Sequence, residues 1–571
     1  MRRLLLALAA LLSLAVLATL LGIYLADDLP EITGGPRILT WHLDQPVIDY
    51  MPRPGWPLPP APSDTSLIDI FAALSSARTD DAVDGVAVYV HNARFGLAKA
   101  QQMRRLLDEI SANGKPVDCY LETAGEGTNG TLAYYLASVC DTVHLAPAGD
   151  LNLLGLLADR LYLRGTLDKL KIEPDFLAVG RYKSAVESYT QTESSEAAEE
   201  ALGALLDDYY DTIVEAIAAA RGVDAAEVAS LIDRAPFTSD EALELGLVDA
   251  VSYPDQFESS IEARLGTEPT YEGLASYLES HRGGGGRRVA VVFAQGVIRR
   301  GASGIDPWTA DVFLGSRDLG EILEELREDD RIAAVVLRID SPGGSALASD
   351  LILRQVELLA DAKPLVVSMS DVAASGGYYI ATKARHIVAE EATITGSIGV
   401  YGGKLVTRRF EQEILGFSHD PMKRGENADI YSSLEPFSPE QTERLATLMD
   451  EVYDRFVTHV SNGREISPAA VEEVAQGRVW SGRRAVDIGL VDELGGFEQA
   501  FDAVRESLGL DDDARLSLRL YPQPPGLLDY LLGRARPFLP LRFLAPLERL
   551  DEDHFGLLEL PPNLARLANP F

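Results

Sequence analysis

The sequence has few basic residues and a large excess of acidic ones. Lysine and arginine total 51 against 88 aspartates and glutamates, a formal net charge of −37 over 571 residues. With no basic surplus to neutralise phosphates, a nucleic-acid partner is not expected. We interpret the negative charge as a solvated acidic surface. Hydrophobic residues make up 46% of the chain, so large cores can form in two to four domains of roughly 150 residues each.

Cysteine is almost absent. The chain has only Cys119 and Cys140, too few for a disulfide-based scaffold. Both lie in runs typical of regular secondary structure, which favours packing roles, and a bond between them remains open.

Long hydrophobic runs are rare, but one stands at the N-terminus. Met-Arg-Arg precedes the uncharged stretch Leu4 to Ala26, long enough to span roughly 30 Å of hydrocarbon as a helix. A signal-peptide core is usually about 7–15 residues, so the run predicts an uncleaved anchor, with a long cleaved signal as the alternative. Arg2 and Arg3 are expected to stay in the cytoplasm, which places the body across the membrane.

The region after the anchor alternates between strand and helix patterns. GVAVYV at 85–90 reads as a strand, an amphipathic helix is predicted at about 97–112, and another strand follows Lys115-Pro116. This order predicts β-α-β units around a mainly parallel sheet.

The pattern then restarts after a glycine-rich stretch. YYIATKARHIVAEEATITGSIGV (378–400) aligns with YYLASVCDTVHLAPAGDLNLLGL (134–156), and GLVD occurs at both 246–249 and 489–492. Several landmarks in one order indicate an internal duplication. The predicted division is an anchor (1–26), a first repeat (27–280), a linker (281–288), a second repeat (289–510) and a tail (511–571) that packs on the body or lies on the membrane surface.

A possible nucleophile stands in the second repeat. Ser375 lies between the strand-type run 364–370 and the helix-type run 378–384. A serine at a sharp strand-to-helix turn exposes its hydroxyl, and free N–H groups of the first helical turn can hold a developing oxyanion. A tight turn with a polar N-cap is the alternative. The first repeat has Thr131 at the matching position, so this turn exists only once.

A serine nucleophile needs a base, and the chain has only eight histidines. None of them, His386 and His419 included, has a setting that suggests a triad, although sequence spacing cannot exclude one. Lys183, in LAVGRYKSAVESYT, is the other candidate, with an ordinary surface lysine as the alternative reading. It can act as a base only if burial or neighbouring charge lowers its pKa. The matching position of the second repeat is Asn427.

Together these features resemble the signal peptide peptidase A family in its long, duplicated bacterial form. The resemblance extends from Leu4 to about residue 505. The motifs that carry it, besides the anchor, are G-R-Y-K-S-A at 180–185, D-S-P-G-G-S at 340–345, A-S-G-G-Y-Y at 374–379 and T-G-S-I-G at 395–399.

The resemblance implies tandem Clp/crotonase-like α/β domains behind a transmembrane helix. It implies a Ser/Lys protease, without metal or cofactor, that degrades apolar peptides such as signal peptides left in the membrane. The implied assembly is a homotetramer in the bacterial inner membrane with its catalytic body on the periplasmic side. The implied site residues are Ser375 as nucleophile, Lys183 as general base, Ser397 as the group that orients the lysine, and N–H groups of Gly376 and of Gly343 or Gly344 as the oxyanion hole.

Two other classes remain open at this point. A crotonase-type acyl-CoA enzyme would share the turns and the fold, although the anchor and Lys183 speak against it. A non-catalytic membrane scaffold would keep the fold without the chemistry.

Overall fold

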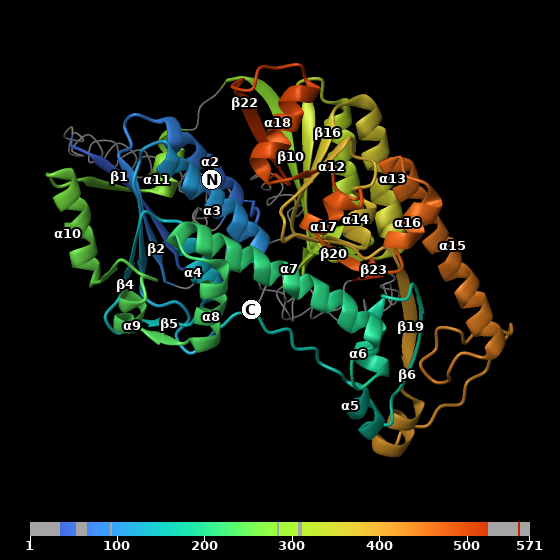
Figure 1. Ribbon diagram of the computed structural model, residues 1–571. Helices are drawn as coiled ribbons and strands as arrows, with labels where there is room; N and C mark the ends of the chain where they lie inside the picture. Colours follow the sequence, from blue (N-terminus) through green and yellow to red (C-terminus); the bar gives the residue numbers. More distant parts are fainter. Residues whose placement is uncertain are drawn as a thin grey trace, which may run out of the picture.

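The computed structural model describes two α/β units side by side (Figure 1). The described residues are 35–52, 66–91, 94–281, 285–306, 311–523 and 558–559. The predicted anchor, residues 4–26, lies outside these ranges. Of the residues described, none belongs to a helix that is both long and apolar enough to cross a membrane.

The first unit is built on a six-stranded parallel sheet with the order β8-β4-β3-β2-β1-β9. Every residue of its strand β2 is buried, as expected for a parallel sheet covered on both faces. The strands are β1 (Arg37–Leu43), β2 (Gly85–Val90), β3 (Val117–Leu121), β4 (Thr142–Leu145), β8 (Ala250–Val251) and β9 (Thr270–Gly273). The helices are α2 (Leu67–Thr79), α3 (Leu97–Ala112), α4 (Thr131–Ala137), α5 (Arg164–Lys169), α6 (Glu187–Thr190), α7 (Glu196–Arg221), α8 (Ala225–Arg234), α9 (Ser239–Glu244), α10 (Pro254–Leu265) and α11 (Leu274–Ser280).

The second unit has an eight-stranded sheet that contains the path β21-β17-β16-β14-β10-β22, all parallel. Its strands are β10 (Arg287–Gln295), β14 (Ala334–Ser341), β16 (Leu365–Ala374), β17 (His386–Ala389), β18 (Ile394–Gly396), β20 (Val479–Ser481), β21 (Glu493–Leu494) and β22 (Leu516–Tyr521). Its helices are α12 (Ser316–Glu328), α13 (Ala346–Ala362), α14 (Gly376–Tyr379), α15 (Pro439–Arg464), α16 (Pro468–Val474), α17 (Gly482–Asp487) and α18 (Phe497–Ser507).

The two parallel paths have the same strand order. Read in sequence, β1, β2, β3, β4, β8 and β9 of the first unit take the places of β10, β14, β16, β17, β21 and β22 of the second. The chain therefore carries tandem α/β domains, as the internal duplication predicts. Smaller pieces add to each unit: the pair β5 (Asp150–Leu151) and β7 (Phe237–Thr238), and a five-stranded sheet of β12 (Gly304–Ile305), β13 (Val312–Gly315), β11 (Val297–Arg299), β15 (Gly343–Gly344) and β23 (Leu558–Glu559).

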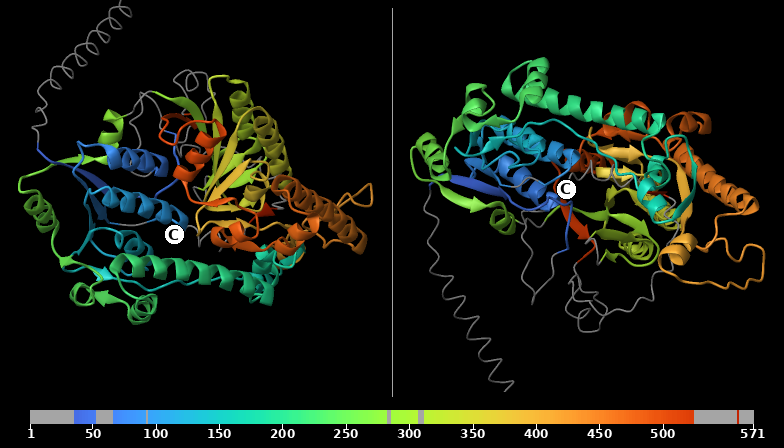
Figure 2. Two further views of the ribbon diagram at one scale, coloured as in Figure 1. Left: turned by 45° about the horizontal axis from the view of Figure 1, so that its top comes forward. Right: turned by 90° about the horizontal axis from the view of Figure 1, so that it is seen from below.

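One hydrophobic core continues across the two units. It includes Leu74 of α2 and Met103 of α3 together with Val291 of β10 and Phe497 of α18. Helix α7 runs along both units in the two views of Figure 2, and its Tyr209 hydroxyl donates to the carbonyl of Ala392, just before β18. Such a shared core fixes the two units against each other.

A two-stranded ribbon joins segments that are far apart in the sequence. β6 (Glu173–Val179) pairs antiparallel with β19 (Val400–Val406), in register from Val179 opposite Val400 to Glu173 opposite Val406. The ribbon projects from the body beside α5 and α6 (Figure 1). Because β6 ends only three residues before Tyr182 and four before Lys183, the ribbon carries that segment onto the second unit.

Two sequence predictions need correction. The helix expected at 378–384 is only the four-residue α14, because the N–H groups of Ala381, Thr382 and Ala384 bond to the carbonyl three residues back, as in turns, and not four back as in an α-helix. The preferred packing role for the cysteines is also incomplete, since Cys119 of β3 and Cys140 after α4 form a disulfide. The helix predicted at about 97–112 matches α3.

Candidate active site

Ser375 lies at a sharp turn between β16 and α14. Its backbone has φ 54° and ψ −116°, a left-handed conformation that non-glycine residues adopt at a cost of about 1–3 kcal/mol. The turn is held in place because the N–H of Ser375 donates to Gly396 O at 2.8 Å, and the N–H of Tyr379 donates to Ser375 O, also at 2.8 Å. The Ser375 side chain has no exposed surface.

The two glycines after Ser375 allow close packing of the turn. A Cβ on Gly376 would lie 2.6 Å from Ser349 Oγ and 3.2 Å from Gly344 N, and one on Gly377 would lie 2.5 Å from Ser341 O. A side chain at Gly377 would displace the backbone of Ser341, and one at Gly376 would press on the Ser349 hydroxyl. The nucleophile turn and the Ser341–Gly344 turn therefore lie against each other.

Lys183 comes from the first repeat and reaches Ser375 through the β6–β19 ribbon. It precedes a short 3-10 turn, Ser184–Val186, and only 3% of its surface is exposed. The nearest acid in the sequence, Glu187, has other partners: its carboxylate pairs with Arg160 at 3.5 Å and accepts a hydrogen bond from Ser195 Oγ.

The amine of Lys183 is surrounded by three oxygen atoms of the second repeat. Nζ lies 2.8 Å from Ser375 Oγ, 3.0 Å from Ser397 Oγ and 3.1 Å from Ser397 O. A neutral amine has two hydrogens and one lone pair. The two oxygens of Ser397 can accept both hydrogens, which aims the lone pair at the Ser375 hydroxyl. This arrangement can remove the proton from a serine as it attacks an electrophile.

The predicted oxyanion donors lie beside this contact. Gly376 N is at the start of α14, next to Gly344. The N–H of Gly343 donates to Ser341 Oγ at 3.2 Å. Of the two glycines in this turn, Gly344 is therefore better placed to share an oxyanion with Gly376.

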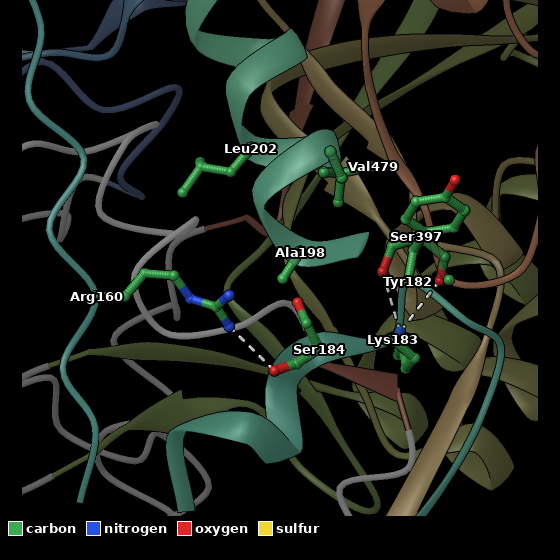
Figure 3. A pocket seen from close by; sticks show the side chains of 10 residues that line it. Arg160, Tyr182, Lys183, Ser184, Ala198, Leu202, Ser397 and Val479 are labelled. Atoms are coloured by element: carbon green, nitrogen blue, oxygen red, sulfur yellow. Dashed lines mark hydrogen bonds between the residues drawn. The ribbon is translucent and has the colours of Figure 1, made fainter. Parts of the chain in front are cut away.

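A cavity of about 20 Å³ adjoins the lysine (Figure 3). Its wall combines Lys183 and Ser397 with apolar side chains, among them Leu202 of α7 and Val479 of β20. The space is about that of one water molecule, too small for a substrate side chain.

The other basic candidates point elsewhere. His386 Nε2 lies 2.9 Å from Glu493, and His419 pairs with Glu411. Thr131, the counterpart of Ser375, donates to Gly155 O and accepts from Gly155 N. Within the described ranges, no group of three or more His, Cys, Asp or Glu side chains is placed to hold a metal ion.

The sequence analysis did not identify the segment 476–478, which bonds both to the residue before Lys183 and to Ser397 and Ile398. Tyr182 N–H donates to Gln476 O, Ser397 N–H donates to Arg478 O, and Gly477 N–H donates to Ile398 O, each at 2.7 Å. A Cβ on Gly477 would lie 2.7 Å from Lys183 Cβ. Counted from the two GLVD runs, the first repeat has Arg234 at the position of Gly477, so this glycine, like the one after Ser375, occurs in only one copy.

Comparison with known proteins gives a consistent result. A family model described as "Peptidase family S49" matches residues 109–267 and 357–511, one segment in each repeat. The chain is 32% identical to "Serine protease SPPA, chloroplastic" of Arabidopsis thaliana, over 82% of this chain and 70% of that protein. It is 33% identical to "Protease 4" of Salmonella typhi, over 84% of this chain and 78% of that protein.

A match to a solved structure is weaker. "ClpP1 from Listeria monocytogenes" is 15% identical, covers 36% of this chain and 91% of that chain, and has a TM-score of 0.22. A score this low supports no argument about the fold, so the Clp/crotonase-like class stays a prediction.

We predict that Lys183→Arg reduces kcat by about 100-fold or more, because the always-protonated guanidinium has no lone pair to accept the serine proton. In the parent enzyme, kcat/KM should rise from acid to mildly alkaline pH, since only the neutral amine can act as the base. The measurement is a pH profile of peptide hydrolysis. Lys169→Arg, on the exposed end of α5, is the matched control and should keep parent activity. Full activity in Lys183→Arg would remove the lysine from the mechanism.

We predict that Ser397→Ala lowers kcat by about 10- to 100-fold with little change in KM. The substitution removes one hydrogen bond to the amine, about 1.5–3 kcal/mol if the amine becomes charged, and leaves the bond to Ser397 O. Ser188→Ala is the control, because Ser188 is also buried and its Oγ has no hydrogen-bond partner among the described residues. Unchanged turnover in Ser397→Ala would reduce this residue to a turn former.

Proposed function

The chain belongs to peptidase family S49 and is a serine peptidase, and on that premise we propose that a Ser375–Lys183 dyad hydrolyses apolar peptides. The proposed substrates are signal peptides that remain in the membrane after their release from secreted proteins. The proposal rests on the 2.8 Å contact between Lys183 Nζ and Ser375 Oγ, made between residues of different repeats.

The proposed reaction follows from the atoms around that contact. Neutral Lys183 takes the Ser375 proton as Oγ attacks the peptide carbonyl, and the N–H groups of Gly376 and Gly344 hold the oxyanion. Protonated Lys183 then donates to the leaving amine, and an acyl-enzyme remains on Ser375. Water, deprotonated by Lys183, attacks the acyl group and frees the carboxylic acid. Ser397 holds the amine in place throughout the cycle.

A strand edge beside the dyad supports a peptide as the substrate. β15, which contains Gly343 and Gly344, pairs antiparallel with β23, two residues of the chain's own C-terminal segment. Because this edge already pairs with one extended segment, it can also pair with an extended peptide, through main-chain hydrogen bonds and next to the Ser375 turn. We extend the proposal to a Clp/crotonase-like form of both domains.

Location and assembly are part of the proposal. The apolar run 4–26 supports a single membrane anchor, and Met-Arg-Arg before it supports a catalytic body on the periplasmic side of a bacterial inner membrane. The Cys119–Cys140 disulfide agrees with an oxidising compartment. A homotetramer remains our proposal for the assembly. Family membership argues against the two alternatives, the acyl-CoA enzyme and the non-catalytic scaffold.

The decisive experiment is hydrolysis of a defined synthetic signal peptide in detergent, with products identified by mass spectrometry. We expect cleavage within the apolar core by the parent enzyme and none by Ser375→Ala. A fluorophosphonate probe should label the parent but not the variant. Labelling without cleavage of the apolar peptide, together with cleavage of polar peptides, would keep the dyad and reject the substrate class. Cleavage by Ser375→Ala would reject the dyad itself.

The location is tested with a thiol reagent on protein from freshly lysed cells and with protease added to spheroplasts. We expect Cys119 and Cys140 to resist a maleimide in the denatured, unreduced protein and to react after reduction, because both sulfurs are bonded. Protease added to spheroplasts should degrade the body, whereas a cytoplasmic body would stay intact. Free thiols in freshly lysed cells would contradict an oxidising location.

A further inference from the structure

Five charged side chains, four of them buried, meet where the two repeats join. Asp49 and Lys99 come from the first repeat, and Arg338, Asp340 and Asp371 come from the second. Lys99 Nζ lies 2.7 Å from Asp340 Oδ2, bonds to Asp371 Oδ2, and lies 3.8 Å from Asp49 Oδ2. Only Asp340 keeps substantial exposure, 24% of its side chain, against 4% or less for the others.

The cluster forms because α3 inserts its first two turns between the repeats. All seven residues from Leu97 to Met103 are buried, including the polar Lys99, Gln101 and Gln102. The residue before α3 is Gly96, which offers no side-chain cap. Asp371 supplies one from the other repeat, because its Oδ1 accepts the N–H of Lys99 at 3.1 Å. Lys99 thus binds Asp371 with both its main chain and its side chain.

The two carboxylates that Lys99 joins lie at a β-bulge. β14 and β16 pair in steady register up to Ile339 opposite Met369, and the next pair is Ser341 opposite Ala373. One residue of β14, Asp340, therefore faces three residues of β16. Asp340 Oδ1 accepts the N–H of Val372 at 3.2 Å, which satisfies a backbone group that the bulge removes from the ladder.

The bulge is followed on β14 by the Ser341–Gly344 turn and on β16 by the Ser375 turn. After Asp340, Ser341 Oγ donates to Gly296 O at 2.7 Å and accepts the N–H of Gly343, so this side forms the proposed oxyanion turn. On the other strand, Asp371 stands four residues before Ser375. The relative shift of the strands at the bulge sets where Gly344 lies with respect to Ser375.

We propose that Lys99 is a positioning residue of the active site: by joining Asp340 to Asp371 it fixes the β14–β16 bulge and so holds Gly344 and Ser375 in reacting geometry. The first repeat then supplies two lysines, one to the chemistry and one to its geometry. The proposal rests on the Ser375–Lys183 dyad proposed above.

The charges explain why a cation is needed at this place. Two cations face three carboxylates, and burial together with the charges of Asp49 and Asp371 raises the pKa of Asp340 to about 6, against the opposing effect of Lys99. Burial also opposes the charge on Lys99, but the three carboxylates outweigh it and raise its pKa. Without Lys99, Asp340 and Asp371 would repel each other across the bulge, and the strands would shift apart.

The test compares two variants on the same helix and the same interface. Lys99→Met removes the charge at the bulge. Arg105→Met removes another cation of α3 that bonds across to the second repeat, at Glu390, away from the bulge. We expect Lys99→Met to lower kcat by about 10- to 100-fold with KM within about twofold, since a misplacement near 1 Å costs about that much. Arg105→Met should keep kcat within twofold. Thermal unfolding of both full-length variants reports any loss of stability.

A second variant covers the case in which Lys99→Met does not fold. Asp340→Asn keeps the size of the side chain and removes one buried negative charge, so the fold should persist, but its amide cannot accept from both Lys99 and Val372 in the same way. We expect the same fall in kcat at constant KM. Parent kcat in folded Lys99→Met or in Asp340→Asn would overturn the proposal, as would equal kcat losses in Lys99→Met and Arg105→Met at equal loss of unfolding temperature.

Failure of the dyad would give a different result. If Ser375→Ala or Lys183→Arg stays active, the proposed dyad is wrong, whatever Lys99 does. If both are inactive while Lys99→Met turns over at the parent rate, the dyad stands and only the positioning role is rejected.

Discussion

The pairing of β6 with β19 is the constraint on which the geometry of the proposed dyad depends. Lys183 and Ser375 are 192 positions apart, so nothing local brings them together. The ribbon places Val179 opposite Val400. Lys183 follows the first of these residues by four positions, and Ser397 precedes the second by three, so the lysine and its Ser397 partner both leave the same end of one ladder. A slip of one residue would turn side chains to the opposite face and move the amine away from both serines.

The site stores conformational strain that the rest of the molecule must hold. Ser375 and Ser397 both have left-handed backbones, with φ of 54° and 53°, at about 1–3 kcal/mol each. Each is pinned by a main-chain hydrogen bond, Ser375 to Gly396 and Ser397 to Arg478. Cores on both sides of the sheet, one of them continuous with the first repeat, keep these bonds from opening. The two strained turns hold the hydroxyls of Ser375 and Ser397 within hydrogen-bond distance of the Lys183 amine.

Much of the fold could be predicted from the sequence because its signals are local and repeated. The run at 85–90 and the helix at 97–112 have the bounds of β2 and α3, and the duplication follows from landmarks in a constant order. Ser375 could be identified from the sequence because a strand pattern, a turn of small residues and a helix pattern adjoin it. Lys183 was identified with any weight only through the family resemblance, since its local sequence fits a surface lysine equally well.

The rest depends on contacts between distant segments. The residue pattern of β6 does not show that it pairs with a strand of the other repeat, because the pattern of a short strand does not specify which strand it bonds to. Gly477 is visible only as a glycine that one copy lacks, and Lys99 is one cation in an ordinary amphipathic pattern. The disulfide likewise required the distance between β3 and the end of α4, which spacing in sequence does not provide.

The complete burial of the Ser375 side chain has a consequence for substrate choice. A folded protein offers convex surfaces and paired backbones, and neither can bring a carbonyl carbon to an oxygen that has no exposed area. Under the proposed function, an extended chain reaches this oxygen by adding at the β15 edge, where two residues of the chain's own C-terminal segment now pair. Under the proposed function, substrate choice therefore depends first on whether a chain is extended and only then on its sequence, and folded proteins would be poor substrates.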